Sequence, residues 1–349
     1  MTRKILTVVG ARPQFVKAAA VSRAVARRDG IREVMLHTGQ HFDANMSDIF
    51  FEELGIPAPD HHLDIAGGGH GEMTGRMLGA IEAVLIEEKP DWVLVYGDTN
   101  STLAGALAAA KLHIPVAHVE AGLRSFNRRM PEEINRVLTD HVSARLYCPT
   151  GAAIRNLAEE GIRKGVLHVG DVMYDAAIDA RRRAQSGPDI LARAGVEPGG
   201  YSLATVHRAE NTDDAARLRA VVGHLERVAA ERTVVLPLHP RTAQAVARFG
   251  ISLSRLTVIE PVGYLEMTAL LAGCVDVHTD SGGVQKEAYF HGKLCVTLRD
   301  ETEWVETVEA GWNRLWSVPD YKQPRQAIDE YGSGNAAELI VADLLQATR

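Results

Sequence analysis

The chain of 349 residues lacks several features that would assign it to common classes of protein. Its three cysteines, Cys148, Cys274 and Cys295, form no CxxC pair, which argues against disulfides and against a thiolate metal site. No apolar run approaches the roughly 18 residues of a membrane span. The net charge of −7 argues against a nucleic-acid partner, because such a partner requires a basic surface.

Motifs of several enzyme classes are also missing. The sequence has no GxGxxG dinucleotide fingerprint, no HExxH zinc motif and no GxSxG nucleophile turn, so neither a cofactor nor a metal is expected. A predicted strand begins at Lys4 with no signal peptide before it, so the expected location is the cytoplasm. The composition, 46% hydrophobic and 24% charged, is that of a soluble globular protein.

Apolar strands alternate with helices along the chain, which is the pattern of parallel sheets covered on both faces. This alternation runs to Val169 and begins again at Tyr201. We therefore predict an α/β fold with two doubly wound, Rossmann-like domains, residues 1–169 and 170–334. Ligands are expected in a deep cleft between the two domains.

The stretch Val93–Arg136 contains three acids at the ends of predicted secondary structure. Asp98 and Glu120 each follow an apolar strand, and Glu132 lies in the first turn of a helix. Asp98 could instead cap the next helix, and Glu132 could serve only the helix dipole. Glu120 should point into the crevice at the strand ends. Together with nearby arginines, the acids indicate acid–base chemistry on an anionic substrate.

The sequence Asp280-Ser281-Gly282-Gly283 precedes a predicted helix and favours an anion site. Free amide groups at a helix start point at an anion, and glycines let the backbone approach it. The alternative is a serine N-cap followed by a glycine turn. Glu287, one turn into the helix, should reach sideways, where sugar hydroxyls would suit it.

Histidine and arginine pairs end two further strands, at His207-Arg208 and at His239-Pro240-Arg241. A lone histidine is more often structural, but two such pairs facing one cleft favour phosphate contacts. Arg12 and Lys17 would add positive charge at the first strand-to-helix turn.

Eight segments together resemble the non-hydrolysing UDP-N-acetylglucosamine (UDP-GlcNAc) 2-epimerases, in order and over essentially the whole chain. They are GARPQFVK (10–17), TGQH (38–41), GDTNST (97–102), HVEAGLRS (118–125), PEEINR (131–136), HRAEN (207–211), HPRT (239–242) and TDSGGVQKE (279–287). The resemblance implies a GT-B-like architecture, a homodimer and a role in making cell-surface polysaccharide. It also implies that the last helix, 335–349, packs back on the first domain.

The resemblance further implies a UDP-sugar substrate whose C2 is inverted by elimination and re-addition of UDP. The expected catalytic residues are Asp98, Glu120, Glu132 and His207. The expected UDP-sugar contacts are Arg12, Lys17, Arg136, His239, Arg241, Ser281, Gly282, Gly283 and Glu287.

Two substrates share this chemistry, UDP-GlcNAc and UDP-2,3-diacetamido-2,3-dideoxyglucuronate. The common activity of the family places UDP-GlcNAc first. GARPQF and the variant Glu303-Trp304-Val305-Glu306, in which Trp304 replaces an arginine, resemble the branch that acts on the uronate. A GT-B glycosyltransferase and a non-catalytic UDP-sugar-binding regulator are the alternative functions.

Overall fold

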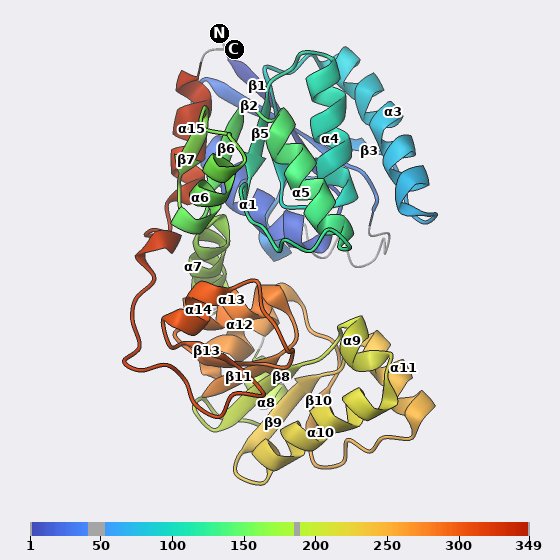
Figure 1. Ribbon diagram of the computed structural model, residues 1–349, viewed down its shortest axis with the longest axis vertical. Helices are drawn as coiled ribbons and strands as arrows, with labels where there is room; N and C mark the ends of the chain where they lie inside the picture. Colours follow the sequence, from blue (N-terminus) through green and yellow to red (C-terminus); the bar gives the residue numbers. More distant parts are fainter. Residues whose placement is uncertain (1, 41–52, 185–188, 348–349) are drawn as a thin grey trace. The chain divides into compact units, whose positions relative to one another are not determined.

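The computed structural model describes residues 2–40, 53–184 and 189–347, with the side chain of Arg12 left out (Figure 1). The chain divides into two compact units. Unit 1 comprises Met1–Ala176 and Asp329–Arg349, and unit 2 comprises Ala177–Ile328. The sequence also predicts a helix from about Asn45 to Leu54, and most of this stretch lies outside the described residues.

Within the described residues, unit 1 holds a seven-stranded sheet in the order β3-β2-β1-β4-β5-β6-β7, and every neighbouring pair is parallel. The strands are β1 (Arg3–Val9), β2 (Ile31–His37), β3 (His61–His62), β4 (Trp92–Tyr96), β5 (Val116–Val119), β6 (Arg145–Cys148) and β7 (Val166–His168). The helices are α1 (Arg12–Ala26), α3 (His70–Glu88), α4 (Asn100–Lys111), α5 (Pro131–Val142), α6 (Gly151–Glu159) and α15 (Ala336–Gln346), with a 3-10 turn at Asp329–Tyr331. Helix α7 (Val172–Ala184) crosses the boundary between the units.

Helices α3, α4 and α5 lie side by side in unit 1, and α15 packs against α1 (Figure 1). Small residues let α4 lie close to the sheet. A side chain at Gly105 would begin 3.1 Å from the Val8 side chain of β1. The strand order reverses direction between β1 and β4, and ligands of such sheets bind outside the strand ends at this point.

Unit 2 contains a six-stranded sheet among its described residues, in the order β10-β9-β8-β11-β12-β13, and it is again parallel throughout. Its strands are β8 (Tyr201–Thr205), β9 (Thr233–Pro237), β10 (Thr257–Ile259), β11 (Asp276–Thr279), β12 (Leu294–Thr297) and β13 (Asn313–Leu315). Its helices are α8 (Ile190–Ala194), α9 (Ala209–Thr212), α10 (Ala215–Ala229), α11 (Pro240–Phe249), α12 (Tyr264–Gly273), α13 (Gly282–Phe290) and α14 (Val305–Glu309). The reversal of strand order here falls between β8 and β11.

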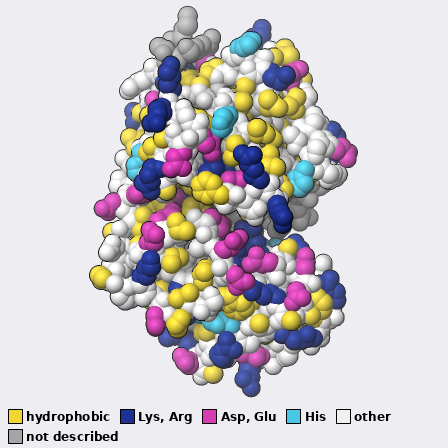
Figure 2. Space-filling view, viewed as in Figure 1, with side chains coloured by type: hydrophobic (Ala, Val, Ile, Leu, Met, Phe, Trp, Pro, Cys, Tyr) yellow, Lys and Arg dark blue, Asp and Glu magenta, His cyan; other side chains and the backbone are white. Residues whose placement is uncertain are grey.

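Helix α5 buries polar residues and exposes apolar ones, whereas an ordinary surface helix buries its apolar side. Its buried residues are polar: Glu133, Asn135, Thr139 and Asp140. Its outer face carries Ile134, Leu138 and Val142 at four-residue spacing, and Ile134 and Leu138 are each 47% exposed. Figure 2 shows hydrophobic side chains at the surface in this region of unit 1. The inner face of α5 therefore serves polar contacts, and its outer face leaves apolar surface unburied.

Candidate active site

Glu120 directly follows β5 and has a backbone φ of 70°, in the left-handed region that residues other than glycine seldom adopt. Its carboxylate forms an ion pair with Nζ of Lys17 from α1, and the two side chains are only 10% and 9% exposed. Strained backbone of this kind persists where the surroundings enforce it, and it is frequent at functional sites. Here the turn directs a carboxylate towards a buried lysine.

Asp98 follows β4 and forms an ion pair with Arg136 of α5, at 2.5 Å. The carbonyl oxygen of Asp98 also accepts a hydrogen bond from Nδ2 of Asn135, at 2.9 Å. The alternative that Asp98 caps α4 is wrong, because Thr99 is the N-cap and its hydroxyl accepts from the Thr102 amide. The Asp98 carboxylate is thus directed by Arg136 and not by the end of α4.

Glu132 and Glu133, adjacent in the sequence, have different surroundings. Glu132 is exposed, whereas Glu133 is 2% exposed. The Glu133 carboxylate accepts from the amides of Ser125 and Phe126, at 2.9 and 3.0 Å, and from Arg136, at 2.6 Å. Burial would raise the pKa of Glu133, but these hydrogen bonds lower it below its ordinary value. Glu133 therefore anchors the loop before α5, a role that the sequence analysis did not assign.

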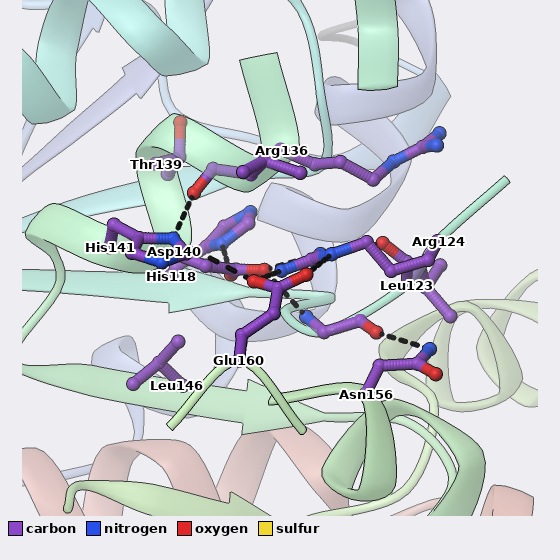
Figure 3. Close-up of polar contacts among 12 residues, drawn as sticks. His118, Leu123, Arg124, Arg136, Thr139, Asp140, His141, Leu146, Asn156 and Glu160 are labelled. Atoms are coloured by element: carbon purple, nitrogen blue, oxygen red, sulfur yellow. Dashed lines mark hydrogen bonds and ion pairs between the residues drawn. The ribbon is translucent and has the colours of Figure 1, made fainter. Parts of the chain in front are cut away.

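A chain of polar contacts links His118, Asp140, Arg124 and Glu160 in unit 1 (Figure 3). His118 of β5 contacts Asp140 of α5 at 2.7 Å, and Asp140 accepts from Arg124 at 2.7 Å. Arg124 in turn donates to Glu160 at 2.6 and 2.8 Å. Arg124 is one of the arginines near the three acids in the sequence. In the structure its side chain is 1% exposed and lies between two carboxylates.

In unit 2, the buried carboxylate of Asp280 organises the turn after β8. It accepts from the backbone amides of His207 and Arg208, at 3.0 and 2.9 Å, and from Nδ2 of Asn211, at 3.0 Å. The rings of His207 and His239 lie 5.4 Å apart, so the two predicted histidines are neighbours. Because β8 and β11 are adjacent strands, the His207 turn and the Ser281 turn meet at one edge of the sheet.

Ser281 is the N-cap of α13, and its hydroxyl accepts from the Val284 amide at 3.4 Å. The predicted capping alternative is therefore confirmed, and it leaves a further role in anion binding open. Gly282 is needed for close approach, since a side chain there would begin 2.3 Å from the Glu303 carboxylate and 3.3 Å from Nε1 of Trp304. Glu287 lies on the same helix and is 8% exposed.

The Arg241 side chain already has hydrogen-bond partners within unit 2. Its guanidinium donates to Thr212 at 2.9 Å and to Asp213 at 3.0 Å. His239 is the N-cap of α11 and accepts from the Arg241 amide. A phosphate contact from Arg241 would therefore require it to exchange Asp213 for the ligand.

The predicted site residues thus form two groups, each within one unit. Lys17, Asp98, Glu120, Glu132 and Arg136 lie in unit 1, and His207, His239, Arg241, Ser281, Gly282, Gly283 and Glu287 lie in unit 2. Among the described residues, no cluster of three or more His, Cys, Asp or Glu side chains could hold a metal ion. No helix among them is long and apolar enough to cross a membrane.

The two parallel, doubly wound α/β units give the protein a GT-B-like fold, as the resemblance implied. A model of the UDP-N-acetylglucosamine 2-epimerase family matches residues 23–345. The chain belongs to this family.

Individual relatives differ in the substrate that they are named for. The UDP-2,3-diacetamido-2,3-dideoxy-D-glucuronate 2-epimerase of Pseudomonas aeruginosa is 59% identical over 316 residues, covering 89% of this chain and 88% of that protein. The UDP-N-acetylglucosamine 2-epimerase of Methanocaldococcus jannaschii is 43% identical over 360 residues, covering 97% and 98%. A crystal structure of the latter enzyme in complex with UDP-GlcNAc and UDP superposes with a TM-score of 0.87, at 42% identity, over 99% of this chain and 100% of that chain.

Proposed function

We propose that this protein inverts C2 of a UDP-2-acetamido sugar by eliminating UDP and adding it back, without net hydrolysis. The observation that carries this proposal is the Glu120 turn, where a strained residue places a carboxylate against Lys17 beside the Asp98 turn. The C2 proton is not acidic, because C1 is not a carbonyl. Loss of UDP from C1 together with the C2 proton solves this problem and leaves a 2-acetamidoglucal.

Different residues transfer the proton, stabilise the leaving UDP and position the carboxylates in this reaction. Carboxylates from Asp98, Glu120 and Glu132 accept the C2 proton and return one to the other face. The free amides at the start of α13 and the side chain of His207 stabilise the charge on the leaving UDP. Lys17 and Arg136, paired here with Glu120 and Asp98, hold those carboxylates in place.

We place the 2,3-diacetamido uronate first among the substrates, ahead of UDP-GlcNAc, which the sequence analysis favoured. The support is the 59% identity to the uronate epimerase, against 43% to a UDP-GlcNAc epimerase. Trp304 supports the same order, because it stands where UDP-GlcNAc epimerases commonly have arginine. Trp304 is buried, and Nζ of Lys286 lies 4.0 Å from its ring centre.

We also propose that the protein is a homodimer and that it acts in making cell-surface polysaccharide. The support for the dimer is the outer face of α5, whose Ile134 and Leu138 leave apolar surface exposed. An apolar helix face of this kind is typical of a surface that another protein chain covers.

Proton NMR of the purified protein with each nucleotide in D₂O tests the reaction. We expect deuterium at C2, appearance of the manno epimer and little accumulation of free UDP. A steady release of UDP without the epimer would show a hydrolase, and intact binding without turnover would show a regulator. The ratio of kcat/KM for the two nucleotides then decides the substrate, and a ratio of about 10² in favour of UDP-GlcNAc would reverse our order.

A further inference from the structure

The buried His118–Asp140 pair joins the three elements that carry the proposed acids. His118 lies in β5, which ends at the residue before Glu120, and Asp140 lies in α5, whose first turn contains Glu132. Both side chains are 0% exposed, and Nδ1 of His118 lies 2.7 Å from Oδ1 of Asp140. The other ring nitrogen, Nε2, lies 2.8 Å from the carbonyl oxygen of Gly97, the residue before Asp98.

The partners of His118 determine its protonation. A carboxylate and a carbonyl oxygen can only accept hydrogen bonds, so this geometry calls for a proton on each ring nitrogen of His118. Burial would raise the pKa of Asp140, but His118 and Arg124 lower it below its ordinary value, so the carboxylate is ionised. Asp140 also accepts from the Gly122 amide, at 3.1 Å, which ties the loop after Glu120 to α5.

Gly97 connects this pair to the proposed reaction centre. Its φ is 61°, and a side chain at its α-carbon would begin 3.3 Å from both the Glu120 carboxylate and Nζ of Lys17. Its carbonyl oxygen is the acceptor for His118. The Gly97 residue therefore contacts the His118 ring and lies close to the Lys17–Glu120 pair, and Asp98 follows it in the chain.

We propose that His118, kept as an imidazolium by Asp140, is a positioning residue that sets the placement of the Asp98 and Glu120 carboxylates relative to one another. This inference rests on the proposed epimerase function. His118 acts through Gly97 and Asp140, because its ring has no exposed surface with which to touch a substrate.

The expected kinetic effect falls on turnover and not on binding. Small displacements of reacting groups cost about 10²-fold in rate, and loss of an outer hydrogen-bond partner typically costs about 10- to 100-fold. We expect His118→Gln and Asp140→Asn to lower kcat by about 10- to 100-fold, with KM changed less than about threefold. Glu160→Gln is the matched control, because Glu160 ends the same chain of charges but contacts neither His118 nor Gly97.

Nitrogen-15 NMR of the wild-type protein, labelled at histidine, tests the pair directly. The His118 signals are assigned in the wild-type protein by correlating its ring with its own backbone resonances, and near neutral pH we expect both ring nitrogens to be protonated. A neutral tautomer would overturn the proposal, whether or not the variants fold. So would an Asp140→Asn variant with the kcat of Glu160→Gln.

The kinetic measurements distinguish a failure of this inference from a failure of the proposed function. If the wild type epimerises neither nucleotide, the proposed function fails and the positioning role falls with it. If the wild type is active and His118 proves neutral, only the present inference fails. An imidazolium together with a selective loss of kcat in Asp140→Asn supports it.

Discussion

The Lys17–Glu120 pair predicts a specific pattern of stability changes. Glu120→Gln removes the counter-ion of a buried ammonium, and Lys17→Met removes the ammonium that is paired with a buried carboxylate. Both side chains are about one-tenth exposed, so water screens the remaining charge poorly. Removing one partner of a buried ion pair costs about 3–5 kcal/mol. We expect each single variant to lose about 3 kcal/mol from unit 1, the lower end of this range.

The double variant Lys17→Met/Glu120→Gln should recover most of that loss, because no unpaired charge remains and methionine fills the volume of the lysine stem. The matched control is Lys4→Met in the same unit. Lys4 pairs with Glu88 at 3.0 Å, but these side chains are 29% and 19% exposed. A more exposed pair of this kind contributes about 1 kcal/mol or less.

Hydrogen exchange followed by mass spectrometry measures these changes unit by unit. Peptides covering 92–119 report on unit 1, and peptides covering 201–205 and 276–279 report on unit 2 as an internal standard. A loss of 3 kcal/mol should speed exchange from globally opened states in unit 1 by roughly 100-fold, since about 1.4 kcal/mol is a factor of ten. If the losses of the single variants simply add in the double variant, the two charges are not coupled and our account of the site is wrong.

Three further predictions follow from other parts of the structure. Glu132→Gln should lower kcat about 10²-fold or more and leave urea unfolding unchanged. Glu133→Gln should instead lower the free energy of unfolding, because it weakens the anchor of the preceding loop. If both variants lower kcat and stability to the same extent, the two residues do not have these separate roles. Burial lowers the pKa of His291 from 6.5 to about 4, so its contribution to stability is complete above pH 6.5 and is lost as the pH falls towards 4. This amounts to about 3 kcal/mol, and urea unfolding of His291→Gln should be less sensitive to acid over that range. Finally, Ile134→Glu/Leu138→Glu should be monomeric by sedimentation if the outer face of α5 forms the dimer, and an unchanged sedimentation coefficient would exclude that face.

The sequence predicted the α/β class and most of the strands because buried parallel strands are short, continuous apolar runs. The apolar runs predict strands at Val116–Val119 and Thr257–Ile259, and these are the bounds of β5 and β10 in the structure. Helices α6 and α11 were not predicted. Each has 10 residues or fewer and begins directly after a strand-end turn, so the turn residues obscured the helical spacing. The resemblance implied that the last helix packs back on the first domain. In the structure, Arg3 of β1 donates a hydrogen bond to the carbonyl oxygen of Leu344 in α15.

The candidate site was predictable as a set of strand ends, but its pairings were not. Lys17 and Glu120 are 103 residues apart in the sequence, and only the adjacency of α1, β4 and β5 brings them together. The expectation that Glu120 points into the crevice at the strand ends did not include its pairing with this buried lysine. The sequence likewise identifies His118 only as part of the segment HVEAGLRS. Nothing in the residues around it indicates that Asp140 of α5 is its partner.

The left-handed backbone at Glu120 lowers the stability of the fold at a residue that the proposed activity needs. Glycine is the residue that this φ of 70° favours, and a side chain there costs roughly 1–2 kcal/mol. A variant with Glu120→Gly and Lys17→Met would relax the backbone and remove both buried charges at once. Directed evolution for heat resistance alone should therefore drift towards losing the carboxylate, and only a selection that demands turnover should hold it in place.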